Sequence, residues 1–593
     1  ATPGVTGRYS NQLNYHSASW PPKLAGSNER RIIARPFGCT RPAATTIRRL
    51  KPCNETMTDT GTLNFCWSQT MVAGLVAAGA TDAIISPGSR STPLALAMLR
   101  QPRLRCHVAV DERSAAFFAV GIAKASRRPI LLLATSGTAP ANWLPAVIEA
   151  SQSGIPLILL SADRPPELLG CGANQTVDQI GLFGSHVRAS HALGTPHEGF
   201  DPDYLHRLAA RVYEQATWPN PGPVHINQPF REPLLPLADT AEAEIPESIR
   251  VAYPVLKPAQ EDIRDFANRI SGRPGIIVCG EMPAYRENSN AIAALAQRLN
   301  VPILAEPLSG LRYGDHDRSH LCVRYNHWLS NQAFADEHQP EWVLRLGAFP
   351  VTRNLQNYVS EIRQTHAVVE PWPRWRDPAH RLTHLFRAEP AVFCAALLAE
   401  SPLAATGGWR QYFVQQELIA AEKADAGQIA AILEEIADAT PLFVGNSLAI
   451  RQLDSLSGSG EKTIHFYGNR GASGIDGNIS TAMGIAAVHG NVVALLGDLT
   501  CQHDLGGLAL AQGRNAVIVT VNNAGGGIFD HLPQCALPEF ERGWRTPQHI
   551  NFEHAALTFG LGFAHADSIA EFRRVLRAAL AAGGPHLIEL QMP

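Results

Sequence analysis

Short apolar runs alternate with amphipathic stretches along most of the chain, beginning near residue 60. The runs are rich in Val, Ile and Leu, and most of them end in a glycine or polar turn that opens a helical period. Buried strands of parallel sheets read as nearly continuous apolar runs, and helices between them cover both faces of the sheet. The pattern therefore predicts an α/β protein built from doubly wound parallel sheets.

The alternation falls into three blocks, separated by stretches that have no hydrophobic period. We expect a first block over 57–235, a middle block over 250–403 and a third block over 409–593. Strands are predicted at 82–86, 104–110, 130–135, 157–161, 275–280, 302–306, 342–347, 367–370, 442–445, 492–496, 517–522 and 587–590, and two helices of the third block at 411–437 and 503–514. No sequence repeat relates the blocks, so only their architecture is repeated.

Length and composition narrow the class of protein. A chain of 593 residues with 45% apolar side chains exceeds what one core can organise, so several domains are expected. The net charge is only −3 and no dense basic face is evident, which argues against a nucleic-acid partner. The ten cysteines form no C-x-x-C pair, and no apolar run approaches the roughly 18 to 20 residues that cross a bilayer. We expect a cytoplasmic protein with reduced thiols and no membrane insertion.

Residues 1–56 differ from the rest of the chain. They carry nine Lys or Arg against two acids, Glu29 and Glu55, and removing them leaves a net charge of −10. Such a stretch is compatible with a targeting segment, a disordered arm or translated sequence upstream of the true start. We favour the last of these, a non-native extension, because Met57 stands where the globular pattern begins.

Two polar motifs end neighbouring strands of the third block. Asp498 follows one apolar run, and Asn523 follows the next run 25 residues later. Strand, helix and strand at this spacing form one right-handed unit, so both side chains should project from the carboxyl edge of the sheet. Their oxygens, with a carbonyl near Gly525, suit Mg²⁺. Either motif alone would more often be a plain turn, but together they favour a metal site.

Glycine-bearing turns add candidates for anion binding. Gly525, Gly526 and Gly527 would let the backbone approach a diphosphate without Cβ clashes. The turns SPGSRSTP and TSGTAPAN each open a helix of the first block, and exposed N–H groups at a helix start attract anions. Ser89 and Arg90 of the first turn could thus receive a substrate carboxylate, although a plain strand-to-helix turn explains either motif equally well.

Several long motifs in order resemble the thiamine diphosphate enzymes, and most closely their menaquinone-pathway branch. These are SPGSRSTP, DERSAAFFAVGIAKAS, TSGTAPAN, SADRPPELLGCGANQ, VGNSLAIR, GNRGASGIDG and GDLT with NNAGGGIF. The resemblance spans about residue 60 to the C-terminus. It implies three domains of the thiamine-enzyme type and thiamine diphosphate held through Mg²⁺ or Mn²⁺ by Asp498, Asn523 and Gly525. Leu499 stands where the general motif has Gly, a departure that suits this branch.

The resemblance also implies the activating carboxylate. Glu112 matches the residue that protonates the aminopyrimidine ring, and we expect its carboxyl in an apolar, partly dry pocket. By itself, Glu112 would be read as an acid that complements a helix dipole. Ile475 matches the apolar prop beneath the bent cofactor. Cofactor contacts are implied at Glu112, Pro87, Ile475, Gly497, Asp498, Leu499, Asn523, Gly525, Gly526 and Ile528.

The implied reaction joins 2-oxoglutarate, with loss of CO₂, to isochorismate by 1,4-addition. Both substrates are dianions, and forked guanidinium groups match carboxylates. Substrate contacts are implied at Ser89, Arg90, Arg164, Asn174, Gln175, Arg353, Ser447, Arg451, Arg470 and Phe529. Any one of these arginines would more often form a structural salt bridge. Before Arg353 stands Thr352, where some relatives carry Lys, which leaves one fewer positive charge.

Assembly and two alternative functions follow from the same motifs. Because the metal ligands and Glu112 lie in different blocks, and in this family on different subunits, a homodimer or homotetramer is implied. One alternative is an acetolactate synthase-like enzyme or 2-keto-acid decarboxylase that uses pyruvate, which needs little cationic lining. The other is a non-catalytic nucleotide-binding regulator, disfavoured because the chain has no G-x-G-x-x-G and no P-loop.

Overall fold

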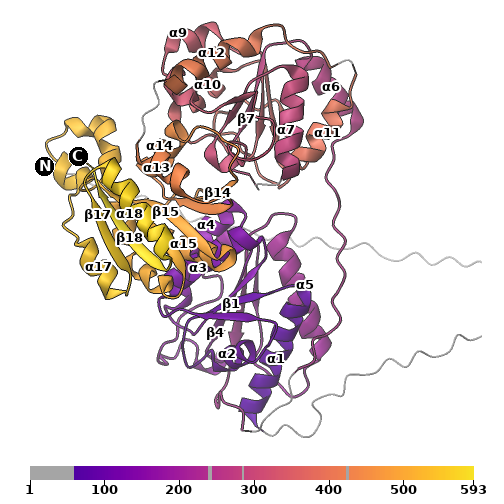
Figure 1. Ribbon diagram of the computed structural model, residues 1–593. Coiled ribbons are helices and arrows are strands. Elements are labelled where there is room, and N and C mark those ends of the chain that lie inside the picture. The colour runs from indigo at the N-terminus through magenta and orange to yellow at the C-terminus, as the bar shows by residue number, and fades with distance from the viewer. Residues whose placement is uncertain (1–58, 238–242, 283–285, 402, 423–426, 593) are drawn as a thin grey trace, which may run out of the picture. The chain divides into compact units, whose positions relative to one another are not determined.

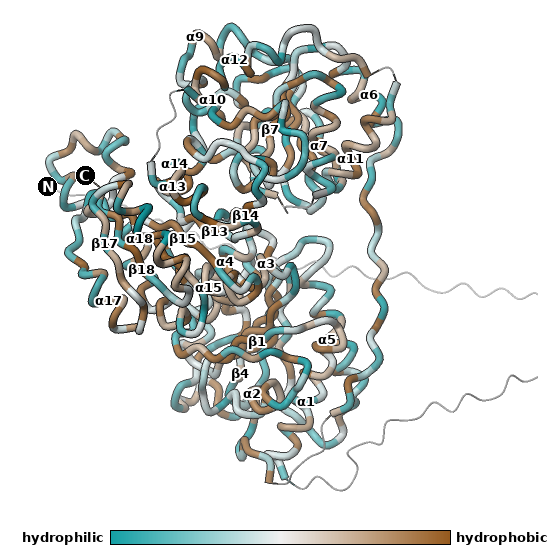
Figure 2. The backbone as a smooth tube through the Cα atoms, in the orientation of Figure 1, coloured by the Kyte–Doolittle hydropathy of each residue, from teal (hydrophilic) through white to brown (hydrophobic). Residues whose placement is uncertain are grey.

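Three parallel sheets organise the chain, whose structure is a computed structural model describing residues 59–237, 243–282, 286–401, 403–422 and 427–592. Each sheet has six strands, and all pairs of named strands are parallel. Helices lie beside each sheet (Figure 1), and hydrophobic residues gather in the interior strands such as β7 and β15 (Figure 2). The predicted fold class is confirmed. The prediction for residues 1–56 lies outside the described residues.

The sheet of the first block has the order β2-β1-β3-β4-β6-β5. Its elements are α1 (Thr60–Ala78), β1 (Asp82–Ile85), α2 (Thr92–Leu99), β2 (Arg105–Val108), α3 (Glu112–Ser126), β3 (Ile130–Ala134), α4 (Leu144–Ser153), β4 (Leu157–Asp163), β5 (Ala189–Ala192), α5 (Pro202–Thr217) and β6 (Pro223–Pro229). All five residues of β3 are buried, which explains its unbroken apolar sequence. The sequence patterns missed β5 and β6.

The sheet of the middle block has the order β12-β11-β10-β7-β8-β9. Its elements are α6 (Gln260–Ile270), β7 (Gly275–Cys279), α7 (Arg286–Leu299), β8 (Ile303–Ala305), β9 (Leu321–Cys322), α8 (Tyr325–Trp328), α9 (Gln332–Glu337), β10 (Trp342–Leu346), α10 (Arg353–Glu361), β11 (Thr365–Val369), β12 (His384–Phe386) and α11 (Pro390–Leu398). The short strands β9 and β12, at the two edges, were not predicted.

The sheet of the third block has the order β14-β13-β15-β16-β18-β17. Its elements are α12 (Trp409–Glu422), α13 (Gln428–Glu435), β13 (Thr440–Val444), α14 (Leu448–Leu456), β14 (Ile464–Tyr467), α15 (Asn478–His489), β15 (Asn491–Gly497), α16 (Asp498–His503), β16 (Asn515–Asn522), α17 (Phe552–Thr558), β17 (Gly562–Ala566), α18 (Ile569–Ala582) and β18 (Pro585–Gln591). The two edge strands β14 and β17 were not predicted.

Two helix predictions in the third block are wrong. The expected helix over 411–437 is two helices, because Gly427 has an extended backbone at the start of α13. The expected helix over 503–514 is replaced by the short α16 followed by a 3₁₀ segment, Leu505–Ala511. Gly506 and Gly507 lie in this segment, and glycine is a poor residue for an α-helix interior.

The first and third blocks pack through α3 and α15, which hold equivalent places in sheets of the same strand order. Each helix follows the edge strand of its sheet, β2 or β14. A Cβ on Gly121 would overlap the Thr481 carbonyl, and one on Gly484 would overlap the Phe118 carbonyl. Glycine at these points allows the helix backbones to touch, and one apolar core continues across both blocks.

Two further features of the described residues are the length of their apolar helices and the burial of their cysteines. Within the ranges given above, no helix combines the length and the apolar character needed to cross a bilayer. Of the eight cysteines that the structure describes, five are buried, as expected for cysteines that pack as small apolar side chains.

Candidate functional site

The predicted metal edge is formed by β15 and β16. These strands are parallel neighbours, with Gly497 opposite Val521, so Asp498 and Asn523 follow adjacent strand ends as expected. Asp498 is the first residue of α16 and is buried. Its carboxylate accepts the Leu499 N–H at 2.8 Å and the Gly525 N–H at 2.6 Å. Burial raises the pKa of Asp498, partly opposed by these backbone N–H groups.

The glycine run packs against the chain itself. Gly525 has a φ of 123°, and a Cβ there would overlap the Arg545 carbonyl. The Gly526 N–H donates to that same carbonyl at 2.7 Å, and Arg545 donates to the Asn523 carbonyl. The glycines allow a close approach of another backbone segment, whereas the predicted approach to a diphosphate stays a prediction. The partner seen here is the segment ending at Arg545, so the N–H of Gly526 is not open to a diphosphate in this conformation.

The donor set at this edge suits a hard cation. Asp498 supplies a carboxylate, Asn523 an amide oxygen and Gly525 a peptide oxygen. No cluster of three or more His, Cys, Asp or Glu side chains that could hold a metal occurs within the described ranges. A metal bound here would have one carboxylate ligand and would depend on phosphate and water oxygens for the rest, as Mg²⁺ commonly does. The residues therefore fit a metal–diphosphate group.

Glu112 begins α3, directly after its N-cap residue Asp111. Its side chain is half-buried, and its carboxylate accepts a long hydrogen bond, 3.4 Å, from the Asn142 amide nitrogen. The dry pocket that we expected around Glu112 is not formed in this structure. The reason is its position: the first turn of a helix at the open carboxyl edge of the sheet leaves the side chain partly in solvent.

The two halves of the predicted site meet through the residue next to Glu112. Arg113 donates to the His503 carbonyl at 3.1 Å and lies 3.9 Å from the Asp504 carboxylate. His503 ends the short helix α16 that Asp498 begins. This contact joins α3 to the C-terminal end of α16 within one chain. Pairing of Glu112 with the metal edge of a second chain is implied by the family resemblance.

The first-block candidates Arg164 and Gln175 converge on Ser136. Arg164 donates to the Ser136 hydroxyl, and the Gln175 amide donates to the Ser136 carbonyl at 2.9 Å. Burial and the charge of nearby Arg90 both lower the pKa of Arg164, so two cations lie close together. The Glu232 and Asp163 carboxylates also act on Arg164 and oppose this lowering of its pKa, so the two cations have acidic groups beside them.

The remaining first-block candidates are either exposed or already hydrogen-bonded within the chain. Arg90 is buried, donating to the Phe230 carbonyl at 3.0 Å and to the Glu232 carboxylate at 2.7 Å. Its guanidinium therefore already has an acidic partner, the salt-bridge alternative considered for each arginine. Pro87, Ser89 and Asn174 are exposed, in the turns that follow β1 and β4.

The third-block candidates gather at the end of β13. Ser447 has a φ of 67° and caps α14, and its carbonyl accepts from Arg451 at 2.7 Å. Arg470 donates to the Asn446 side-chain oxygen at 2.6 Å. Burial and the charge of Arg470 lower the pKa of Arg451, which places these two cations near each other. The structure thus brings Ser447, Arg451 and Arg470 together around Asn446.

Three apolar candidates and Arg353 complete the set. Ile475, Ile528 and Phe529 are half-buried, and Phe529 packs against Gly526 beside the metal edge. Arg353 is the exposed first residue of α10 in the middle block. Within the described ranges, no hydrogen bond or salt bridge joins Arg353 to another candidate residue. Arg353 therefore belongs neither to the group around Ser136 nor to the group around Asn446.

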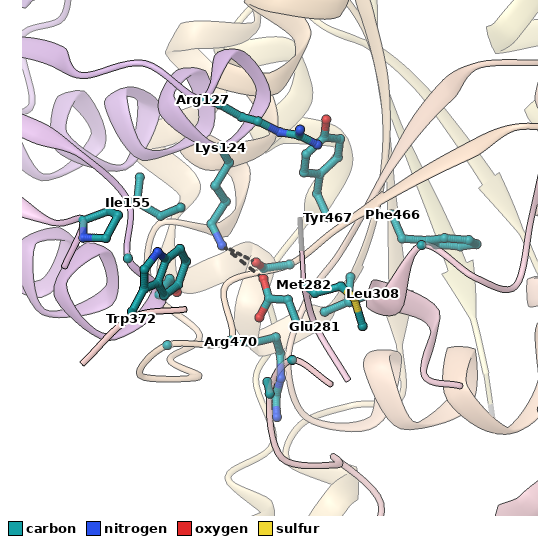
Figure 3. A pocket seen from close by; sticks show the side chains of 18 of the residues that line it. Lys124, Arg127, Ile155, Glu281, Met282, Leu308, Trp372, Phe466, Tyr467 and Arg470 are labelled. Carbon is teal, nitrogen blue, oxygen red and sulfur yellow. Dashed lines mark hydrogen bonds and ion pairs between the residues drawn. The ribbon is translucent and has the colours of Figure 1, made fainter. Parts of the chain in front are cut away.

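A cavity of about 810 Å³ lies elsewhere, with a lining drawn from all three blocks. Lys124, Glu281, Trp372 and Arg470 are among its lining residues (Figure 3). Arg470 is the one predicted site residue in this lining, so the cavity is not the predicted cofactor site. The cofactor edge is defined by strand ends, and a large void is not required to identify it.

Sequence reasoning missed several residues that the structure places at the site. Ser136 and Asn446 stand inside motifs already recognised, TSGTAPAN and VGNSLAIR, and their central place could have been suspected. Arg545 and Arg113 carry no such signal. Arg545 lies 22 residues beyond Asn523, and only the folded chain returns it to that position.

Comparison with protein families gives three matches in order. Residues 67–182 match the family described as thiamine pyrophosphate enzyme, N-terminal TPP binding domain. Residues 256–441 match the middle domain of thiamine pyrophosphate, and residues 457–590 match the thiamine pyrophosphate enzyme, C-terminal TPP binding domain. The matches cover most of the chain.

Two curated relatives are similar over nearly their whole length, and both are named 2-succinyl-5-enolpyruvyl-6-hydroxy-3-cyclohexene-1-carboxylate synthase. The protein of Dechloromonas aromatica (strain RCB) is 66% identical over 535 residues, which are 90% of this chain and 100% of that protein. The protein of Geobacillus kaustophilus (strain HTA426) is 40% identical over 550 residues, 88% of this chain and 94% of that protein.

A solved structure supports the fold alone. The benzoylformate decarboxylase from Polynucleobacter necessarius superposes with a TM-score of 0.66, covering 89% of this chain and 98% of that chain. The sequences are 17% identical, which is too low to carry any statement about substrate.

Proposed function

The chain belongs to the 2-succinyl-5-enolpyruvyl-6-hydroxy-3-cyclohexene-1-carboxylate synthase family of thiamine pyrophosphate enzymes, and from this premise we propose its reaction. It is a transferase of menaquinone biosynthesis that joins 2-oxoglutarate to isochorismate by 1,4-addition and releases CO₂. The observation that carries the proposal is that Asp498 and Asn523 follow the ends of adjacent parallel strands, β15 and β16.

Cofactor binding is assigned to the third-block edge. Asp498, Asn523 and the Gly525 carbonyl would hold Mg²⁺ or Mn²⁺, and the metal would hold the diphosphate of the cofactor. Gly497, Leu499, Gly526 and Ile528 flank this edge, while Pro87 and Ile475 would contact the organic rings. When bound, the thiazolium ring supplies the carbanion chemistry that lets a 2-oxo acid lose CO₂ and form a new carbon–carbon bond.

Proton transfer is assigned to Glu112. Its carboxyl would exchange a proton with the aminopyrimidine nitrogen, a role that requires a position within hydrogen-bond reach of that ring. The half-exposed position of Glu112 in this structure implies that cofactor binding completes the pocket. Water would then be excluded by the cofactor rings and by Ile475 and Phe529.

Substrate binding is assigned to the two cationic groups. Arg164 with Gln175 forms one, and Arg451 with Arg470 and Ser447 forms the other. Two separated cationic groups suit two dianionic substrates, which must be held at once for carbon–carbon bond formation. Ser89, Arg90, Asn174 and Arg353 are further proposed contacts, and Arg90 would have to exchange Glu232 for substrate.

Substrate choice tests this proposal directly. Purified enzyme with Mg²⁺ and thiamine diphosphate should release CO₂ from 2-oxoglutarate in the presence of isochorismate and give the 1,4-addition product. Pyruvate should be a poor substrate, because it has no second carboxylate for the cationic groups. Efficient acetolactate formation from pyruvate, with none of the addition product, would favour the pyruvate enzyme considered as the alternative.

We also propose that the protein is a cytoplasmic homodimer or homotetramer in which the first and third blocks of two chains pair. Mixing Glu112→Gln and Asp498→Ala chains after unfolding and refolding distinguishes the arrangements. If blocks pair between two chains, half of the dimers are mixed and one of their two sites is intact, so about a quarter of wild-type activity returns. If blocks pair within one chain, no activity returns.

A further inference from the structure

The loop that carries Arg470 is held on both sides of this residue by side chains of another block. It runs from β14 to α15, and its backbone from Gly468 to Ala472 lies against α3 and α4 of the first block. Lys124 of α3 donates to the Gly468 carbonyl at 2.7 Å, two residues before Arg470. Figure 3 shows Lys124 directed toward Glu281 of the middle block, 3.8 Å away.

Glu149 of α4 holds the loop on the other side of Arg470. One carboxylate oxygen accepts the Gly471 N–H at 3.0 Å and the other accepts the Ala472 N–H at 2.7 Å. Ser153 donates to the same carboxylate at 2.7 Å, and Lys124 lies 3.7 Å from it. The Glu149 and Lys124 side chains are only 3% and 5% exposed. A buried carboxylate with three donors and a cation is a satisfied arrangement, whose loss would orphan two backbone N–H groups.

Arg470 stands between these two anchors. Its guanidinium donates a hydrogen bond to the side-chain oxygen of Asn446. The Asn446 amide in turn donates to the carbonyls of Asn469 and Gly474 in the same loop. The buried Nε of Arg470 has no hydrogen-bond partner within the described part of the chain. The loop is thus fixed around a guanidinium that retains a free donor.

We propose that Glu149, together with Lys124, is a positioning pair that sets the place of Arg470 and thereby the affinity for a substrate carboxylate. This rests on the proposed function and deepens it, because it adds a determinant of the preference for a dicarboxylic 2-oxo acid. Glu149 acts through the backbone of the loop and does not touch the substrate. Displacing a carboxylate-binding group by about 1 Å can cost on the order of 100-fold in rate.

The test compares Glu149→Ala, Arg470→Met and the double variant in steady-state assays with 2-oxoglutarate and isochorismate. We expect Glu149→Ala to raise KM for 2-oxoglutarate by about tenfold or more, with kcat and thiamine diphosphate affinity within about threefold of wild type. Since both residues would act on one interaction, the double variant should match Arg470→Met within about twofold. Multiplying effects in the double variant would overturn the proposal.

Two further variants guard against a trivial outcome. Glu149→Gln keeps the size of the side chain and one acceptor oxygen, so it should fold even if the alanine variant does not, and should raise KM by a smaller factor. Glu198→Gln, an exposed glutamate of the same block, is the matched control and should behave as wild type. An unchanged KM in folded Glu149→Gln and Glu149→Ala, or a loss of cofactor affinity in either, would refute a positioning role.

Failure of this inference and failure of the proposed function give different results. If the wild-type enzyme makes no addition product from 2-oxoglutarate and isochorismate, the proposed function is wrong. If wild type is active while the Glu149 variants retain its KM, only the positioning role is wrong.

Discussion

The carboxyl edges of the first and third sheets differ in what builds them, although the two sheets share one strand order. At the third-block edge, backbone groups dominate: buried Asp498 is held by two peptide N–H groups, and glycines pack backbone to backbone. At the first-block edge, side chains dominate, with Arg164 and Gln175 meeting at Ser136. We call the backbone-built ends of β15 and β16 the rigid edge, which suits a resident cofactor, whereas the side-chain-built ends of β3 and β4 suit a substrate.

The largest expected effect concerns the rigid edge. Asp498→Ala should abolish metal-dependent binding of thiamine diphosphate, with affinity reduced at least about 100-fold, because Asp498 supplies the one carboxylate of the proposed ligand set. Titration calorimetry with Mg²⁺ and cofactor measures this. Asp567→Ala, an exposed aspartate of the same block, is the control. Retained affinity in Asp498→Ala would remove the proposed metal site.

The next effect separates binding from chemistry at the first-block edge. Glu112→Gln should leave cofactor affinity within about tenfold of wild type while turnover falls by about 10² to 10⁴, the usual worth of a positioned acid or base. Glu198→Gln again serves as the exposed control. Turnover like wild type in Glu112→Gln would end its assignment as the activating carboxylate.

A smaller effect distinguishes an arginine that retains a free donor from one that already has an acidic partner. Arg470→Met should raise KM for 2-oxoglutarate by about 10- to 100-fold, the worth of a hydrogen bond to a charged group. Arg90→Met should raise this KM less, because substrate must displace Glu232, and it should also lower the midpoint of thermal unfolding, because Arg90 is buried and bonded to Phe230 and Glu232. An unchanged KM in Arg90→Met would remove Arg90 from the proposed substrate contacts.

The smallest effect tests whether backbone alone builds the rigid edge. Leu499→Gly restores the residue of the general family motif and keeps the N–H that bonds to Asp498 at 2.8 Å. Cofactor affinity should therefore stay within about threefold of wild type. A large loss in the same titration would show that the Leu499 side chain contributes to the edge and would weaken the contrast between the two edges.

Several strands escaped prediction for one physical reason. Ala189–Ala192 and Gly562–Ala566 are edge strands whose residues are mostly exposed or half-buried, and each contains a histidine. Their sequences lack the apolar run by which the central strands were recognised. Edge strands have one neighbour and partial burial, so their residues are chosen by local contacts that the sequence pattern does not display.

The sequence by itself determined the α/β class and the pairing of Asp498 with Asn523. Both follow from local pattern, since buried parallel strands need apolar runs and a short connection puts consecutive strands side by side. Only the tertiary structure decided which charged groups are free and which are occupied. Arg90 meets Glu232 across 142 residues, and Glu149 reaches Gly471 across 322. Contacts between such distant residues depend on how whole blocks pack, which no local pattern records.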